Sequence, residues 1–258
     1  MATLRSTEPL TVTTLDGEIL TIPPTDIESD EPTLESDFHR EQIEILIACL
    51  KWWSRERNDI YVSGNLTVYY NQDQIKSRDF RGPDFFAVLN VDPHPRKSWV
   101  VWAEDGRYPD VIIEVLSDST AEVDRTTKKQ LYQDTFRTPE YFWFHPITLE
   151  FQGFILTSGR YQPIQPNAQG WLLSQQLGLY LGIYEEQLRY FTLEGELITT
   201  PEELAQQAEK RAEQEKIRAE QAEEQAEQEK IRAEQAEAKL RAAEARLRSL
   251  GITLDDLE

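Results

Sequence analysis

Apolar residues recur at steps of three and four positions in the stretch that begins near Phe38 and runs to Trp53. This spacing predicts an amphipathic helix with one face in a core. The residues that make the pattern are Ile43, Leu46, Ile47 and Leu50.

Runs rich in β-branched and aromatic residues follow this helix and are typical of a buried sheet. They are IYVSGNLTVYY (60–70), DFFAVLNV (84–91), WVVW (99–102) and DVIIEVL (110–116). A helix is expected over about 123–136, then the strand EYFWFHP (140–146) and a β-rich remainder to about 192. This order predicts an α/β or α+β fold, and the stretch 110–145 is long enough for a βαβ crossover between parallel strands.

The N-terminal region, residues 1–34, has its own pattern. In TVTTLDGEILTIPP (11–24), Asp16-Gly17 between two β-rich runs predicts a hairpin, and an acidic segment punctuated by proline follows it. We expect a globular domain over 35–200, a long helix over 201–250 and a short tail over 251–258.

The long helix contains an internal repeat. The sequence AEQEKIRAEQ occurs at 212–221 and again at 226–235, a period of two heptads. Twelve of the fourteen positions with 3-4 spacing from Ala205 to Leu250 are apolar, mostly alanine, whereas Ile217 and Ile231 fall outside them. This pattern favours a coiled coil that makes the protein a homodimer or other homo-oligomer, with orientation left open. The alternative is a single charged helix held by i,i+4 pairs.

Charge and composition restrict the function. The chain has a net charge of −20, but residues 38–200 carry 22 acidic and 16 basic residues, so this segment is only mildly acidic. This charge makes binding to DNA less favourable but does not exclude DNA as a substrate. The three histidines do not have the spacing of zinc ligands. The sequence also has no phosphate loop of a P-loop ATPase and no G-x-S-x-G elbow of an α/β-hydrolase.

The single cysteine, Cys49, cannot form an internal disulfide, and the chain has no apolar run long enough to span a membrane. The N-terminal residues also lack a signal-peptide pattern. We therefore expect a protein of the reducing cytoplasm.

Two carboxylates occupy unusual places in the predicted sheet. Glu114 lies within the most apolar strand, where an unpaired charge would cost several kcal/mol. Asp84 begins another apolar strand directly after Pro83, and the two could converge if their strands are neighbours. Pro109-Asp110 repeats the Pro-Asp pair, but four residues of strand place Asp110 about 13 Å from Glu114, so we interpret Asp110 as a strand-entry residue.

Several motifs together resemble the Uma2 family, also called DUF820, of the PD-(D/E)XK nuclease superfamily. They are GPD (82–84), PDVIIEVLSDST (109–120), the residues Asp124, Lys128 and Tyr132, and PEYFWFHP (139–146). The resemblance covers about residues 35–190. It implies a restriction-endonuclease-like core, a central mixed β-sheet flanked by helices, and metal-dependent DNA cleavage.

The resemblance also implies site residues. Asp84 and Glu114 match the two acidic positions that hold Mg²⁺ or Mn²⁺. Leu116 stands where the parent pattern has lysine, and Lys128 on the following helix takes that place. Glu35, at the start of the first predicted helix, resembles the acidic residue that such nucleases carry on a helix. It is a further candidate metal ligand. His145 stands where the family usually has aspartate.

Each of these residues also has a structural interpretation. Glu114 could form an ion pair with Lys128 or Arg81, and Asp84 could cap a strand. Lys128 could form an exposed i,i+4 pair with Asp124, Glu35 could interact with the helix dipole, and Tyr132 could belong to the core. The sequence therefore predicts a DNA endonuclease that uses Asp84, Glu114 and Lys128. The alternative is an inactive nuclease-like module that acts through its coiled coil.

Overall fold

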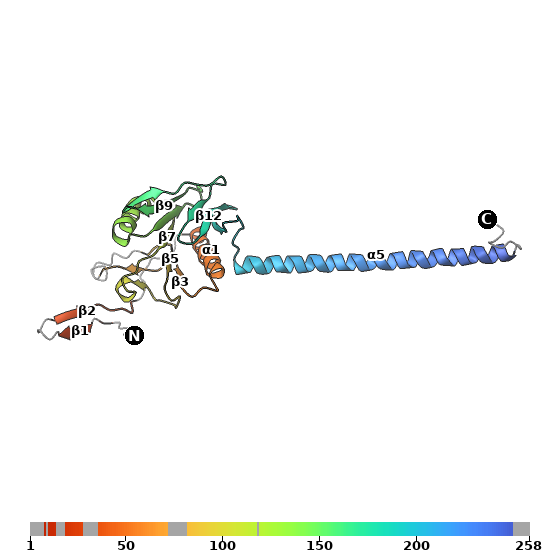
Figure 1. Cartoon of the computed structure of the whole chain (residues 1–258), viewed down its shortest axis with the longest axis horizontal. Coiled ribbons are helices and arrows are strands. Elements are labelled where there is room, and N and C mark those ends of the chain that lie inside the picture. Colours follow the sequence, from red (N-terminus) through yellow and green to blue (C-terminus); the bar gives the residue numbers. More distant parts are fainter. Residues whose placement is uncertain are drawn as a thin grey trace. The chain divides into compact units, whose positions relative to one another are not determined.

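A six-stranded mixed sheet forms the centre of the globular unit in the computed structural model, with strand order β10-β9-β8-β7-β5-β3 (Figure 1). The structure describes residues 8, 10–13, 19–27, 36–71, 82–117 and 119–249. The strands of this sheet are β3 (Ile60–Ser63), β5 (Phe85–Leu89), β7 (Val111–Val115), β8 (Glu140–Phe144), β9 (Phe151–Thr157) and β10 (Arg160–Pro163). β7 and β8 are parallel, and the other neighbours in this sheet are antiparallel. The predicted mixed α/β architecture and the parallel crossover pair are confirmed.

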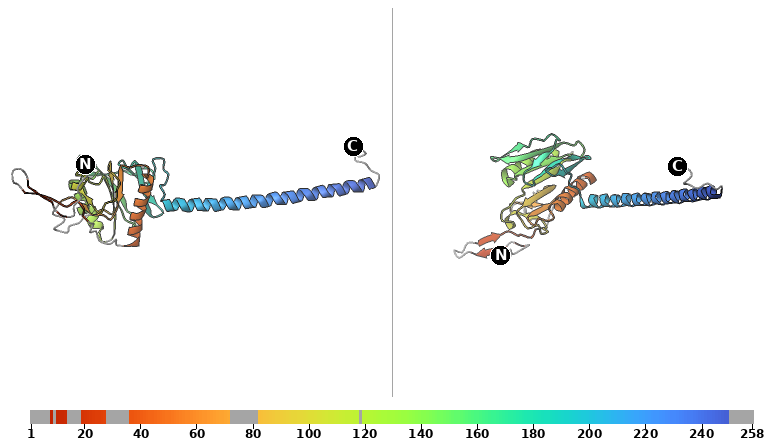
Figure 2. Two further views of the ribbon diagram at one scale, coloured as in Figure 1. Left: turned by 90° about the horizontal axis from the view of Figure 1, so that it is seen from below. Right: turned by 45° about the vertical axis from the view of Figure 1, so that its right-hand side comes forward.

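One face of the sheet packs against α1 (Asp37–Trp53), which also appears beside the sheet in the views of Figure 2. Leu46, Cys49 and Leu50 of this helix are buried against sheet residues such as Phe85 and Ile113. A separate three-stranded sheet packs into the same core. It consists of β11 (Leu172–Ser174), β12 (Leu179–Tyr184) and β13 (Gln187–Phe191).

The opposite face is covered by the crossover between β7 and β8. The crossover is helical from Ala121 to Phe136, and its Tyr132 and Phe136 are buried with Phe86 and Ile112 of the sheet. Because neighbouring strand residues alternate between faces, Glu114 points to the same side as Ile112, toward the crossover.

Two predicted strands are shorter than the sequence pattern indicates. The run 60–70 divides into β3 and the two-residue strand β4 (Val68–Tyr69), and 99–102 gives only β6 (Trp99–Val100) followed by the 3₁₀ turn η1 (Val101–Ala103). β4 and β6 pair with each other in a small parallel sheet. The interruption begins at Gly64, which packs against the backbone of Asp84.

The N-terminal hairpin forms as predicted from β1 (Leu10–Thr13) and β2 (Ile19–Ile22), which pair antiparallel. Its expected turn at Asp16-Gly17 lies outside the described residues, as do Glu35 and the tail 251–258. The chain divides into two compact units, Met1–Pro201 and Glu202–Glu258. α5 (Pro201–Ser249) is a continuous helix of 49 residues, and all of it except Pro201 belongs to the second unit. Within the described ranges, every helix is too short or too polar to cross a bilayer.

Candidate active site

Asp84 and Glu114 face each other across two antiparallel strands. The register pairs Phe85 with Ile113, so the next pair in the same direction is Asp84 with Glu114. The Asp84 amide donates a hydrogen bond to Glu114 Oε2 at 3.2 Å, and the Val115 amide donates to Asp84 Oδ2 at 2.8 Å. The structure therefore brings together the two carboxylates that the sequence singled out.

Lys128 lies between two acidic side chains. Its Nζ is 3.1 Å from Glu114 Oε2 and 2.9 Å from Asp124 Oδ1. The structural alternative for Lys128, an exposed i,i+4 pair with Asp124, is correct in its partner and wrong in its exposure: Asp124 is 1% and Lys128 17% exposed. Both residues are enclosed because the crossover packs on the sheet.

The crossover helix positions these residues through two wide turns. The sequence pattern predicts one regular helix over 123–136, but Asp124–Lys128 and Tyr132–Phe136 are π-helical, separated by an α-turn. Such turns are rare and occur frequently at functional sites. Asp124, Lys128 and Tyr132 all point toward the sheet, where the Tyr132 hydroxyl donates to Glu114 Oε1 at 2.7 Å.

His39 is a site residue that the sequence interpretation missed. It is 6% exposed, and its Nε2 lies 3.2 Å from Asp84 Oδ2. Ser36 caps the first turn of α1 by accepting a hydrogen bond from the His39 amide. The signal was available: His39 lies four residues before Ile43 and seven before Leu46, on the buried face of the helix.

The remaining candidates lie elsewhere. Asp110 Oδ2 accepts a hydrogen bond from the Leu89 amide at 2.7 Å, which fits a residue at the entry to β7. His145 Nδ1 accepts from the amides of Ile147 and Thr148 at 3.2 and 3.4 Å. His145 therefore caps the turn that follows β8, and an aspartate oxygen could accept the same two bonds.

Close backbone contact fixes the position of Asp84. The Asn65 amide donates to the carbonyl oxygens of Pro83 and Asp84, both at 3.1 Å. A Cβ atom on Gly64 would lie 2.3 Å from the Asp84 carbonyl oxygen. Only glycine allows the chain after β3 to approach Asp84 this closely.

The site has an excess of buried acidic groups. Three carboxylates, those of Asp84, Glu114 and Asp124, surround one ammonium group, that of Lys128. Burial raises the pKa of Glu114 well above its usual value, and attraction to Lys128 opposes this shift. Burial also raises the pKa of Asp124, again against the attraction of Lys128.

The other two groups shift toward their charged forms. Burial alone would raise the pKa of Asp84, but the hydrogen bond from His39 and the charge of Lys128 lower it below its usual value. Burial alone would lower the pKa of Lys128, but its acidic neighbours raise it overall. Lys128 therefore remains a cation under ordinary conditions.

The donor chemistry fits a divalent cation. With all three carboxylates ionised and Lys128 protonated, two negative charges remain uncompensated by these four groups. The two contacts that the Asp84 carboxylate makes with described residues both engage Oδ2. The described residues contain no group of three or more His, Cys, Asp or Glu side chains arranged for a metal. Mg²⁺ is often held by one or two carboxylates, with water and substrate phosphate supplying the other ligands.

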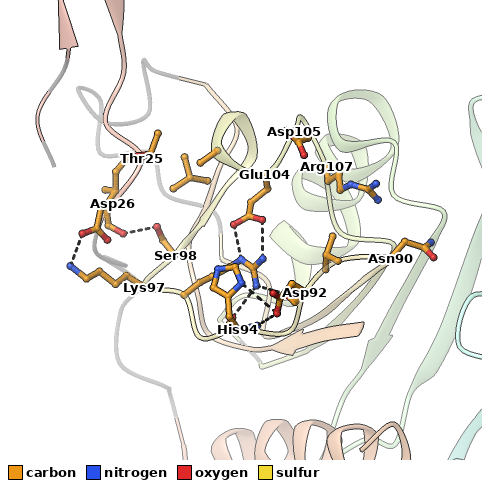
Figure 3. A pocket seen from close by; sticks show the side chains of 15 residues that line it. Thr25, Asp26, Asn90, Asp92, His94, Lys97, Ser98, Glu104, Asp105 and Arg107 are labelled. Carbon is orange, nitrogen blue, oxygen red and sulfur yellow. Dashed lines mark hydrogen bonds and ion pairs between the residues drawn. The ribbon is translucent and has the colours of Figure 1, made fainter. Parts of the chain in front are cut away.

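A pocket elsewhere on the same unit does not include this site (Figure 3). Its Arg96 forms two bonds to Glu104, at 2.6 and 2.9 Å, and its guanidinium stacks over Tyr61 and Trp99. Lys97 pairs with Asp26, and Ser98 donates to the Ile27 carbonyl, so the pocket wall joins the N-terminal segment to β6. These charged residues of the pocket are therefore paired with one another and connect segments of the fold.

Comparison with known proteins identifies the family. The Uma2 family model, described as "Putative restriction endonuclease", matches residues 14–194. The chain belongs to the Uma2 family. Among solved structures, this Uma2 chain is similar to "a putative nuclease belonging to DUF820 from Anabaena variabilis ATCC 29413", with 13% identity, a TM-score of 0.41, and coverage of 67% of this chain and 86% of that one. No curated protein matches the chain. The restriction-endonuclease-like class expected from the motifs agrees with this membership.

Proposed function

We propose that this Uma2 protein hydrolyses phosphodiester bonds in DNA with a divalent metal ion. The observation that carries the proposal is the meeting of Asp84, Glu114 and Lys128 in one buried cluster. Membership of a family described as "Putative restriction endonuclease" supports the same reaction class.

Asp84 and Glu114 would hold Mg²⁺ or Mn²⁺. When bound, such an ion neutralises charge on the scissile phosphate and lowers the pKa of a bound water. The two acids are suited to this because their strands fix them opposite each other, and because their excess charge favours a cation over an empty site.

Lys128 acts as a charge stabiliser. A lysine that keeps its proton cannot serve as a general base, and the surrounding acids raise the pKa of Lys128. Its ammonium group can instead donate hydrogen bonds to a phosphate oxygen that gains negative charge in the transition state.

Three other groups orient the carboxylates. The Tyr132 hydroxyl fixes one oxygen of Glu114, while His39 and the Val115 amide fix one oxygen of Asp84. Such fixed partners reduce the reorganisation that accompanies ligand binding and catalysis. We propose them as positioning residues.

DNA is the proposed substrate, and the protein is proposed to act as a homo-oligomer through α5. The mild negative charge of residues 38–200 makes broad electrostatic attraction to DNA weak. Binding is therefore expected to depend strongly on the metal, which Asp84 and Glu114 would hold and which would supply the positive charge that attracts a phosphate.

The test is cleavage of plasmid DNA in Mg²⁺ or Mn²⁺ by wild type, Asp84→Asn and Glu114→Gln. Asp110→Asn is the matched control, because Asp110 also follows a proline at a strand entry but bonds to Leu89 away from the cluster. We expect the first two variants to lose cleavage and the control to retain it. Equal cleavage by all four proteins would identify a contaminating nuclease.

A second candidate is an inactive module that retains the nuclease fold and acts in assembly. The burial of Glu114 and its existing contact with Lys128 favour this alternative, because an ion pair already compensates the carboxylate. Mg²⁺ separates the two functions: it should raise the melting temperature of the enzyme but not that of the inactive module.

A further inference from the structure

The helix α5 exposes apolar side chains along its whole length. None of its 49 residues is buried, and a rise of 1.5 Å per residue makes it about 73 Å long. Leu204 is 38% and Leu240 61% exposed. A long helix that is polar on most sides and buries nothing is stabilised either by dense pairs within the helix or by a partner.

The apolar seam of α5 has the geometry of a coiled coil. Its a positions recur every seven residues from Ala205 and its d positions every seven from Ala208. Eleven of the thirteen seam positions up to Leu247 are apolar, the exceptions being Glu215 and Glu229. The seam alone, however, does not choose a partner or a direction.

The charges beside the seam are sorted by sign. The g positions, each directly before an a residue, are basic apart from Leu204 and Gln225, and the e positions, each directly after a d residue, are mostly acidic. The g residues are Leu204, Arg211, Arg218, Gln225, Arg232, Lys239 and Arg246. The e residues are Glu209, Lys216, Glu223, Lys230, Glu237 and Glu244.

This sorting favours a second copy of the same helix in the parallel direction. In a parallel pair each g residue meets the e residue five positions later in the other chain. The pairs Arg218 with Glu223, Arg232 with Glu237 and Lys239 with Glu244 are then attractive, each occurring twice. In an antiparallel pair g meets g, so Arg or Lys would face Arg or Lys along one side of the helix.

The departures from the pattern also fit the parallel pair. Lys216 and Lys230 are the basic e residues, and each directly follows a seam glutamate, Glu215 or Glu229. Because d and e side chains of facing helices are neighbours, Lys216 of one copy can compensate Glu215 of the other. Arg211 against Lys216 is the like-charged pair that remains.

We propose that α5 joins two copies of this chain as a parallel, in-register coiled coil. Both globular units are then attached at the same end of the coil. If the proposed nuclease function holds, the dimer carries two active sites attached to the same end of the coil, one for each strand of a duplex. That consequence rests on the proposed function, whereas the assembly does not.

The experiment combines mass measurement with cross-linking of the full chain. Light scattering should give the mass of two chains. Ala212→Cys places a thiol on the seam near one end of α5, and oxidation with diamide should join two copies of this variant. Glu224→Cys, on the outer face of the helix, is the matched control and should not cross-link, and the native Cys49 is fully buried.

Each outcome decides the proposal. A dimer that cross-links through Ala212→Cys but not Glu224→Cys supports it, and a dimer that cross-links through neither is antiparallel or out of register and overturns it. A monomeric full chain overturns it as well. Arg218→Glu with Arg232→Glu should raise the dissociation constant about tenfold or more, since attractive pairs become repulsive. An unchanged constant in this variant would contradict the role of the charged flanks. All of these measurements are independent of DNA cleavage.

Discussion

Lys128 reaches Glu114 from a different element, with its Nζ 3.1 Å from Glu114 Oε2. The lysine comes from the crossover helix and the acid from β7, so the pair depends on the packing of the helix against the sheet. Replacing Lys128 by methionine would keep much of the side-chain volume and remove the charge.

We expect Lys128→Met to lower the cleavage rate by about a hundredfold or more, because a positioned charge is lost. It should also lower the free energy of unfolding by about 3 kcal/mol, because buried carboxylates lose their cation. Lys129→Met is the control: Lys129 Nζ lies 3.4 Å from the centre of the Phe154 ring, away from Glu114. Single-turnover cleavage and chemical denaturation measure the two effects, and equal rates for the two variants would contradict the assignment.

A lysine placed at position 116 of the strand should not replace the function of Lys128. Leu116 is 2% exposed and packs in the core cluster that includes Ala121 and Tyr132. In Lys128→Met, a second change of Leu116→Lys would bury a charge among apolar side chains and should further destabilise the protein. Restored cleavage in this double variant would show that the strand position can still supply the lysine.

The hydrogen bond from Tyr132 to Glu114 should stabilise the folded site. Tyr132→Phe removes a 2.7 Å bond to a buried carboxyl group and should cost about 1 to 3 kcal/mol of unfolding free energy. Tyr190→Phe is the matched control, since the Tyr190 hydroxyl is buried without a hydrogen-bond partner in the described part of the chain. Its loss should change stability by less than about 0.5 kcal/mol or increase it. Equal losses in denaturation experiments would mean that Tyr132 contributes only by packing.

Asp110 should produce a distinctive pH dependence of stability. Burial raises the pKa of Asp110 above its ordinary 3.8, although the bond from the Leu89 amide opposes the shift. At a pH between the ordinary pKa and the raised pKa of Asp110, the folded protein keeps a proton that the unfolded chain has lost. The free energy of unfolding therefore falls as the pH rises through this window. Asp110→Asn should remove that part of the slope and be at least as stable at neutral pH. Denaturation curves of both proteins across this pH range test the expectation, and parallel pH profiles would contradict it.

Gly64 should control the placement of Asp84. In Gly64→Ala the new methyl group would meet the Asp84 carbonyl oxygen and Ile43, so the backbone must shift. We expect a loss of about 1 to 3 kcal/mol in stability. The stabilisation by Mg²⁺, measured as a rise in melting temperature, should also decrease. A variant with the wild-type response to Mg²⁺ would show that Asp84 tolerates the shift.

The sequence predicts the fold where spacing alone decides the structure. Alternating and helical patterns indicate β7, α1 and the crossover, and the Pro-Asp pair before β5 points to Asp84. The spacing of His39 from Ile43 and Leu46 indicates that His39 is buried. Its contact with Asp84 joins a helix to a strand far along the chain, so the spacing does not identify the partner. The π-turns around Lys128 occur together with tertiary hydrogen bonds: Tyr132 in the second turn donates to Glu114, and the Tyr141 hydroxyl of β8 donates to the Asp124 carbonyl. Such tertiary contacts cannot be predicted from the spacing of residues along the sequence.

The repeated sequence in α5 leaves its alignment ambiguous. Residues 212–221 and 226–235 are identical, so sliding one helix by 14 positions past another restores the same seam and the same flanking charges within the repeat. Slippage is therefore opposed mainly by residues outside the repeat, above all Leu240 and Leu247, whose larger side chains would meet alanines in a shifted pair. Truncating these leucines to alanine would produce a helix with several nearly equivalent alignments. The coil can also gain or lose 14 residues without changing which faces meet.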